Sequence, residues 1–200
     1  MPLTYIPDSQ QMVLPISTAT EINIANCNLS GNLVVLPQTS MTSFTASNNN
    51  FKSITLKGCD AMVSADVSDN PRLDNFVDSE EFAILEDLDG SGCNFDSFPD
   101  DLGKASNTVI DLSDNPITSA FDLSACVALV TLNLSGCALP LAVQKAIVAD
   151  LIEANNADGL LLDMSGDTNA AADTALQEAA EALVVVGWVA VELNGYSAPA

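Results

Sequence analysis

The sequence predicts an α/β solenoid, a fold in which short strand-containing coils stack on one another with their strands in parallel. One apolar pattern recurs seven times along the chain, at intervals that are almost constant. With 48% hydrophobic residues, the 200-residue chain can also bury a continuous apolar core. A fixed period of this length is typical of a repeat architecture whose neighbouring units share one core.

The repeated pattern has two apolar residues that flank one outward residue, followed by an Asn- or Cys-type position and another apolar residue. The first apolar positions are separated by 22, 21, 23, 22, 22 and 30 residues. Alternate residues of a strand face the same side, and adjacent rungs lie about 4.8 Å apart. We therefore expect the first apolar residues to face inside on consecutive rungs: Ile22, Phe44, Ala65, Leu88, Ile110, Leu132 and Leu162.

A polar or thiol side chain follows each predicted strand, at the corner of the coil. Buried polar groups need hydrogen-bond partners, and the backbone of the adjacent coils can supply them. We predict a structural ladder at these corners, formed by Cys27, Asn49, Asn70, Cys93, Asn115, Cys137 and Asp167.

Three segments carry a family resemblance: LVTLNLSGCAL (129–139), NTVIDLSDNPI (107–117) and VSADVSDNPRL (63–73). They resemble bacterial leucine-rich repeats of the short, irregular kind, and the resemblance covers residues 20 to 195. It implies a stack of seven coils with a parallel concave sheet. It implies little about function, because such folds host many unrelated binding roles.

The lengths of the intervals predict where helices form. Intervals of 21 to 23 residues are too short for a full return helix, so the convex side should be mostly loops, short strands or 3₁₀ turns. The 30-residue interval and the tail predict helices over 139–155 and 170–183 and a strand over 188–193. We divide the chain into an N-terminal arm or cap (1–19), a solenoid (20–169) and a helix-strand cap (170–200).

The last of these segments carries a second resemblance. DMSGDTNAAADTALQEAAEALVVVGWVAVEL (163–193) resembles the C-terminal part of leucine-rich-repeat proteins encoded by tailed bacteriophages. The resemblance implies a virion component. For Trp188 within it, we expect packing in the cap.

One outward residue lies between the two inward residues of each predicted strand. We predict that this column forms the concave face: Asn23, Thr45, Asp66, Asp89, Asp111, Asn133 and Asp163. The carboxylates of Asp66, Asp89 and Asp111 are candidate ligands for Ca²⁺, which prefers oxygen atoms. The alternative is a solvated acidic face.

The cysteines are expected to be buried structural thiols: Cys27, Cys59, Cys93, Cys126 and Cys137. Cys93 and Cys137 would lie two rungs apart, about 9–10 Å, which is beyond the reach of a disulfide. The chain has no His and no CxxC pair, so a zinc site is not expected.

Charge and composition exclude several functions. The chain has 27 acidic and 5 basic residues, a formal net charge of −22, which opposes binding to nucleic acid or anionic lipid. No apolar stretch reaches the length of about 18 residues that membrane insertion needs. The acidic pairs Glu80–Glu81 and Asp100–Asp101 lack a nucleophile or phosphate loop beside them, so we expect neither an enzyme nor a cofactor.

These observations favour a non-enzymatic accessory structural or interaction protein of a bacteriophage virion, on the head or the tail. It would be synthesised in the cytoplasm of the bacterial host and act through its repeat surface. Its partners would be other virion subunits or a host cell-surface component. One alternative is a host-recognition adhesin, and another is an intracellular bacterial module that binds a partner.

Overall fold

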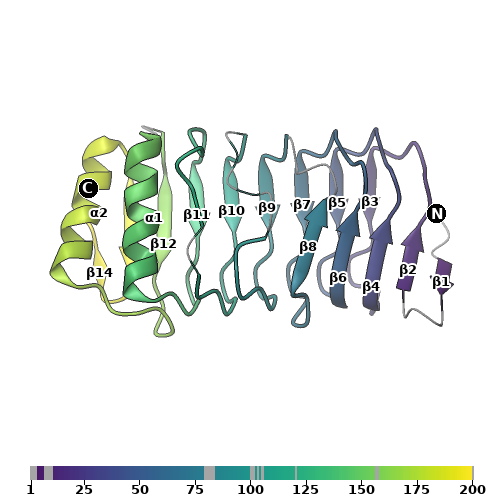
Figure 1. Ribbon diagram of the computed structural model, residues 1–200, viewed down its shortest axis with the longest axis horizontal. Helices are drawn as coiled ribbons and strands as arrows, with labels where there is room; N and C mark the ends of the chain where they lie inside the picture. The colour runs from purple at the N-terminus through teal and green to yellow at the C-terminus, as the bar shows by residue number, and fades with distance from the viewer. Residues whose placement is uncertain are drawn as a thin grey trace. The chain divides into compact units, whose positions relative to one another are not determined.

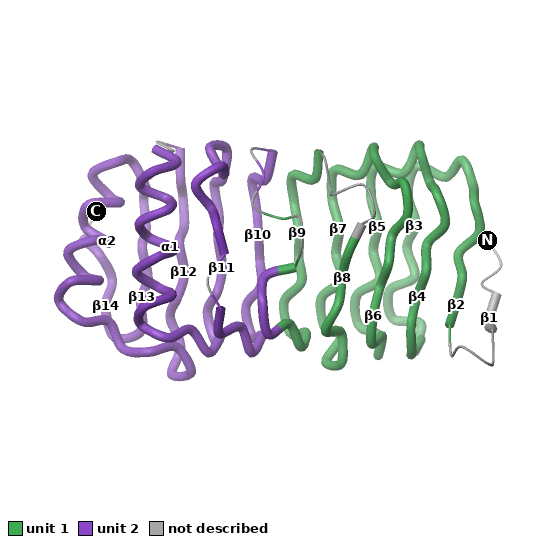
Figure 2. Tube along the Cα trace, in the orientation of Figure 1, with its two compact units in different colours: residues 1–95, 99–102 green, residues 96–98, 103–200 purple. Residues whose placement is uncertain are grey.

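The computed structural model describes residues 4–6, 11–78, 84–99, 102, 104, 106–119, 121–155 and 158–199. The chain divides into two compact units (Figure 2). Unit 1 comprises Met1–Phe95 with Pro99–Leu102, and unit 2 comprises Asp96–Phe98 with Gly103–Ala200. Both units consist of coils whose strands pair in parallel with those of the next coil, so the predicted parallel-strand solenoid is confirmed.

One row of strands in unit 1 follows the predicted repeat. It consists of β3 (Glu21–Asn23), β5 (Ser43–Thr45), β7 (Ser64–Asp66) and β9 (Asp87–Asp89). The parallel register sets Ile22 against Phe44, Phe44 against Ala65, and Ala65 against Leu88. All four side chains are buried, so these residues share one apolar spine as expected.

A second sheet in unit 1 carries the return segments, in the order β1-β2-β4-β6-β8. Its strands are β1 (Thr4–Ile6), β2 (Gln11–Leu14), β4 (Ser30–Val35), β6 (Asn50–Leu56) and β8 (Asn75–Asp78). β1 is antiparallel to β2, and the other pairs are parallel. In Figure 1 β4, β6 and β8 lie in front of β3, β5 and β7, and the inward side chains of these two rows are buried. The unit is therefore closed by strands on both faces of its core.

Unit 2 continues the same kind of register with a different return. Its strands are β10 (Val109–Asp111), β11 (Thr131–Asn133), β12 (Leu161–Met164), β13 (Ala190–Leu193) and β14 (Tyr196–Ser197). Ile110 pairs with Leu132, Leu132 with Leu162, and Leu162 with Val191, and all four are fully buried. β14 turns back antiparallel to β13 and ends the sheet.

Two helices pack against the strands of unit 2 and against each other (Figure 1). α1 (Leu141–Ala154) ends at Asn155, which adopts a left-handed conformation (φ 52°). α2 (Thr174–Val186) begins after Asp173, whose side chain accepts a hydrogen bond from the Leu176 N–H and caps the helix. Both predicted helices are present, the second shifted by a few residues toward the C-terminus because of this cap. Among the described residues, no helix is both long and apolar enough to cross a membrane.

Trp188 closes the core beneath these helices, as the sequence led us to expect. Its side chain is buried, and its ring lies against the backbone of Gly159. A Cβ atom at residue 159 would come within 2.2 Å of the ring, so only glycine fits there without a shift of the tryptophan.

Candidate functional site

The outward column of unit 1 is held by short hydrogen bonds rather than left free. Asp66 Oδ1 accepts the N–H (3.1 Å) and the Oγ–H (2.6 Å) of Ser68, two residues further along the chain. Asp89 accepts from Ser91 in the same way, at 3.0 and 2.7 Å. The second oxygen of Asp66 accepts from Ser47 Oγ on the neighbouring coil, at 2.8 Å. Each carboxylate therefore closes the turn that follows its strand.

Unit 2 repeats this arrangement with both aspartate and asparagine. Asp111 Oδ1 accepts from the N–H and Oγ–H of Ser113, and Asn133 Oδ1 accepts from those of Ser135. Asn133 Nδ2 donates to Asp111 Oδ2 at 2.9 Å. An amide oxygen and a carboxylate oxygen thus both serve as the acceptor of this turn, so asparagine and aspartate can occupy the same position of the column.

These contacts bear on the calcium hypothesis for Asp66, Asp89 and Asp111. Asp66 uses both oxygens, and so does Asp111, for hydrogen bonds to serine and asparagine side chains. Within the described part of the chain, no group of three or more His, Cys, Asp or Glu residues is arranged to hold a metal ion. These carboxylates therefore take part in turn hydrogen bonds, and the choice between a calcium site and a solvated acidic face stays a prediction.

Several side chains of the predicted corner ladder join their coil to the coil before it. Asn49 Oδ1 accepts the N–H groups of Cys27 (3.2 Å) and Leu29 (2.9 Å), and its Nδ2 donates to Ile24 O and Ala46 O. Asn70 is fully buried and bonds the Phe51 N–H in the same manner. Asn115 is also buried, and its Nδ2 donates to carbonyls of its own coil. The corner amides therefore fix the stacking of the coils.

Two of the corner cysteines perform the same task with a thiol. Cys93 Sγ donates to Val67 O and Cys137 Sγ donates to Leu112 O, both at 3.2 Å and both across to the preceding coil. Desolvation by burial raises the pKa of Cys93 to about 12 and that of Cys137 to about 11. These thiols stay protonated at neutral pH and are poor nucleophiles.

Cys27 corrects the expectation that all five thiols are buried. Four of the cysteines are buried, but Cys27 is exposed. Its Sγ donates to Ala25 O of its own coil, because no described strand precedes β3 in this sheet to receive the bond. The corner position alone does not bury a side chain, since burial needs a preceding coil.

The corner of the coil at β12 is Asn169 rather than the predicted Asp167, which is exposed. Asn169 Oδ1 accepts from the Leu139 N–H, and Nδ2 donates to Leu134 O and Met164 O. Two extra residues delay this corner, and Gly166 (φ 100°) brings the backbone close to Gly136. The residue type could have identified this corner from the sequence, because an asparagine side chain can both donate and accept hydrogen bonds there, whereas an aspartate only accepts them.

Two buried glutamines form hydrogen bonds with the backbone of the return segments, and the sequence did not predict them. Gln38 Nε2 donates to Pro15 O and Leu36 O, and Ser17 Oγ donates to Gln38 Oε1. Gln144, on α1, donates to Leu139 O and Ala170 O. Neither residue lies in the repeated pattern, so the period carries no information about them.

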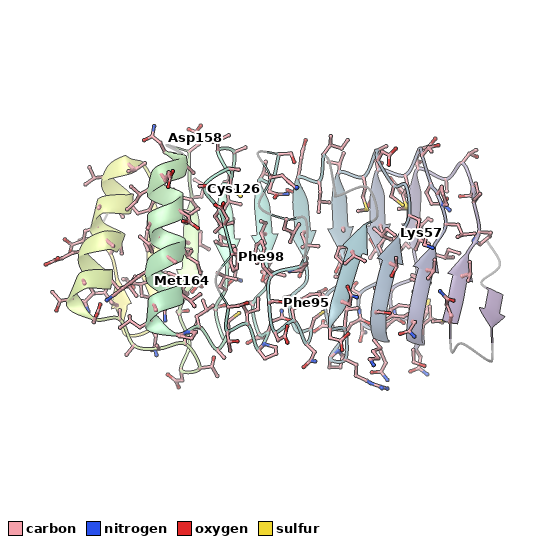
Figure 3. All side chains as sticks on the ribbon, viewed as in Figure 1. Lys57, Phe95, Phe98, Cys126, Asp158 and Met164 are labelled. Carbon is pink, nitrogen blue, oxygen red and sulfur yellow. The ribbon has the colours of Figure 1, made fainter. Side chains whose placement is uncertain are left out.

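An open hollow lies beside α1 in unit 2, lined by Phe121, Asp122, Ser124, Ala146, Asp150 and Glu153. Asp122 accepts from the N–H and Oγ–H of Ser124, and these bonds lower the pKa of its carboxyl. Asp150 accepts from the Leu123 N–H, and the Phe121 ring stacks on that of Phe98, which Figure 3 labels. Asp122 thus closes a local turn, whereas Asp150 joins α1 to the segment at Leu123. Glu80, Glu81, Asp100 and Asp101 lie outside the described residues.

Comparison with known proteins adds no assignment to this geometry. No family model matches the chain, and no curated protein matches it.

Proposed function

We propose that this chain is a non-enzymatic accessory protein of a bacteriophage particle, on the head or the tail, that binds or braces a partner through its outward strand face. We also propose that its coils are leucine-rich repeats, about seven in number by their period. The virion assignment is supported by the resemblance of residues 163–193 to phage-encoded proteins of that family. The binding role has separate support from the geometry.

The observation that carries the binding role is the fixed geometry of the outward column. Asp66, Asp89, Asp111 and Asn133 each accept two hydrogen bonds from a serine two residues later. Side chains that are already held lose little conformational entropy when a partner binds, so the face is preorganised for recognition. Corner amides beneath it make the coils that carry this face resistant to shearing.

The chemistry of the thiols supports a non-enzymatic role. Burial raises the pKa of Cys126 to about 12, in addition to those of Cys93 and Cys137, so the three groups are not poised as nucleophiles. With no His in the sequence, the most common general base of enzymes is also missing. The acidic residues of the column serve as hydrogen-bond acceptors of turns.

The decisive experiment locates the chain in purified particles. Phage particles from a lysate that expresses the chain are separated on a density gradient, washed in high salt, and analysed by quantitative mass spectrometry. We expect the chain to co-purify in a fixed ratio to the major capsid or tail protein, with a host cytoplasmic protein as the negative control. Its absence from washed particles would overturn the virion assignment and favour an intracellular partner-binding module.

A second measurement separates bracing from host recognition. Purified chain is incubated with host cells and with isolated surface glycans, and bound protein is quantified. An accessory structural protein should not bind either one. Saturable binding to cells would favour the adhesin alternative instead.

A further inference from the structure

Unit 2 differs from unit 1 in having an apolar strip at the edge of its outward face, where its strands begin. We define the apolar strip as Val109, Val130, Leu160, Leu161 and Val189. The structure pairs Leu161 with Ala190, and the Leu160 N–H donates to Val130 O at 2.7 Å, so these residues lie on neighbouring rungs. Leu160 is 56% exposed, Val189 57% and Val109 38%. Large apolar side chains gathered in this way on a surface mark interaction sites more often than scattered ones do.

The matching positions in unit 1 are almost all polar, which shows that the strip is not a requirement of the fold. The register of unit 1 puts Glu21, Ser43, Ser64 and Asp87 in the column that Val109, Thr131, Leu161 and Ala190 occupy in unit 2. Coils of this type therefore stack equally well with a hydrophilic column. The apolar side chains of unit 2 need another explanation than stacking.

An acidic row runs beside the apolar strip, further along the same strands. It consists of Asp111, Asp163 and Glu192, and the strand register places Asn133 between the first two. Val109 and Leu161 lie two residues, about 6.8 Å, before Asp111 and Asp163 on the same face, whereas Val130, Leu160 and Val189 lie one residue earlier, where the chain enters the strands. The helices α1 and α2 cover the opposite, inward face, where Leu162 and Val191 are buried. A partner that fits both the row and the strip needs apolar and cationic side chains side by side.

The spacing of the rungs identifies the kind of element that fits. A helix lying across the strands presents a new turn every 5.4 Å, close to the rung spacing of about 4.8 Å. An extended chain presents alternate side chains every 6.8 Å or so and loses register within two rungs. Over the three intervals from β10 to β13, a helix accumulates a mismatch of only about 2 Å.

We propose that the outward face of unit 2 docks an amphipathic helix of a partner protein, whose leucine-like side chains cover the apolar strip while adjacent lysines or arginines meet the acidic row. This inference rests on the proposed binding role and names the class of partner. Apolar burial supplies the affinity, and the acidic row sets the orientation of the helix across the strands.

The test uses the full chain and a defined probe. The probe is a stapled helical peptide of about four turns with leucines along one side and lysines along the adjacent side. Its control is a stapled peptide of the same composition in scrambled order, which has the same charge. Fluorescence anisotropy should show the ordered peptide binding at least about tenfold more tightly than the scrambled one. Equal affinities would mean that the net charge of −22 alone attracts the peptide, and would overturn the proposal.

Matched variants locate the binding face. Leu160→Ser with Val189→Ser should weaken binding about tenfold or more, whereas Val185→Ser, on α2 and 87% exposed, should leave it unchanged. Asp163→Asn should weaken binding and reduce its salt dependence; Asn133 accepts from Ser135 in the same turn, so the fold tolerates an amide at this column. Glu178→Gln, on α2, is the charge control. Equal effects of the strip variant and of Val185→Ser would overturn the proposal.

This test and the particle test fail separately. A chain that binds the probe through the strip but is absent from particles loses only the virion assignment. A chain that is bound to particles but does not distinguish the ordered from the scrambled peptide loses only the present inference.

Discussion

Unit 1 and unit 2 have the same parallel strand register but close their coils differently. In unit 1 the chain returns through strands, of which β4 and β6 are six and seven residues long. In unit 2 the return between β10 and β11 contains no described helix or strand, whereas the returns after β11 and β12 form the helices α1 and α2, of 14 and 13 residues. The comparison teaches that one stacked spine accepts returns of different secondary structure, and that the described helices form only in the longer returns. The predictions below test that separation of spine and returns.

The largest expected effect comes from placing a charge in the spine of either unit. Leu134→Asp in unit 2 and Val67→Asp in unit 1 each bury an uncompensated carboxylate where the side chain is fully buried. We expect a loss of more than about 3 kcal/mol in the free energy of unfolding for both. Chemical denaturation followed by circular dichroism measures it. Leu134→Met, which conserves volume, should cost less than about 1.5 kcal/mol.

If the spine and the returns are separable, both units must respond to this change. A near-normal unfolding transition for Val67→Asp alone would show that the second sheet of unit 1, rather than its inward spine, determines the stacking there.

The corner at β12 gives the next largest effect and separates Asn169 from Asp167. Asn169→Ala removes the acceptor of the Leu139 N–H and one donor to each of the buried carbonyls of Leu134 and Met164. One buried unsatisfied group costs about 1–3 kcal/mol, so we expect a loss of about 3 kcal/mol. Asp167→Ala should change the free energy of unfolding by less than about 0.5 kcal/mol, because it removes an exposed side chain. Comparable losses in the free energy of unfolding for both variants would show that Asp167 also forms part of the corner.

The period of the sequence was sufficient to predict the spine, because alternation and stacking leave little choice about which residues face inside. Ile22, Phe44, Leu88, Ile110 and Leu132 lie as expected. The helices of unit 2 followed from the longer interval. These features depend on local spacing, which one sequence displays.

What the sequence could not show depends on contacts between coils. Cys27 has the same template position as Cys93, yet only Cys93 has a preceding coil whose carbonyl its thiol can reach. Asn169 was missed because an irregular turn delays the corner, and the backbone conformation of Gly166 is not visible in a pattern of apolar residues. The hydrogen bonds of the outward column were missed because their donors, the serines two residues later in each coil, are not part of the repeated apolar pattern.

Thiol reactivity tests the cysteines of both units in one experiment. We expect one fast-reacting thiol, Cys27, when the native chain is mixed with a thiol-specific reagent, and all five after denaturation. Raising the pH from 7 to 9 should not make Cys93, Cys126 or Cys137 reactive, because burial holds their pKa values at about 11 to 12. Mass spectrometry of the labelled peptides identifies each site. Early labelling of Cys137 would contradict its hydrogen bond to the Leu112 carbonyl.

The smallest effect concerns the α2 cap, which exists only in unit 2. A hydrogen bond from Lys145 Nζ (2.7 Å), together with that from the Leu176 N–H, lowers the pKa of Asp173 below its usual value. Because this pKa is lower in the folded chain than in the unfolded chain, ionised Asp173 stabilises the fold at any pH above the unfolded pKa of about 3.9. This contribution is lost as the pH falls through the folded pKa. Asp173→Asn keeps a capping oxygen but removes the ion pair.

The melting temperatures of the parent chain and of Asp173→Asn should therefore differ slightly at pH 7 and converge as the pH is lowered toward 2. Both partners are partly exposed, so salt should also reduce the difference. Asp167→Asn, at another exposed aspartate, serves as the control for a general change of charge. A difference that persists at low pH would assign the effect to the capping hydrogen bond from Leu176 rather than to Lys145, and the return helix would then depend on its own cap more than on its neighbour.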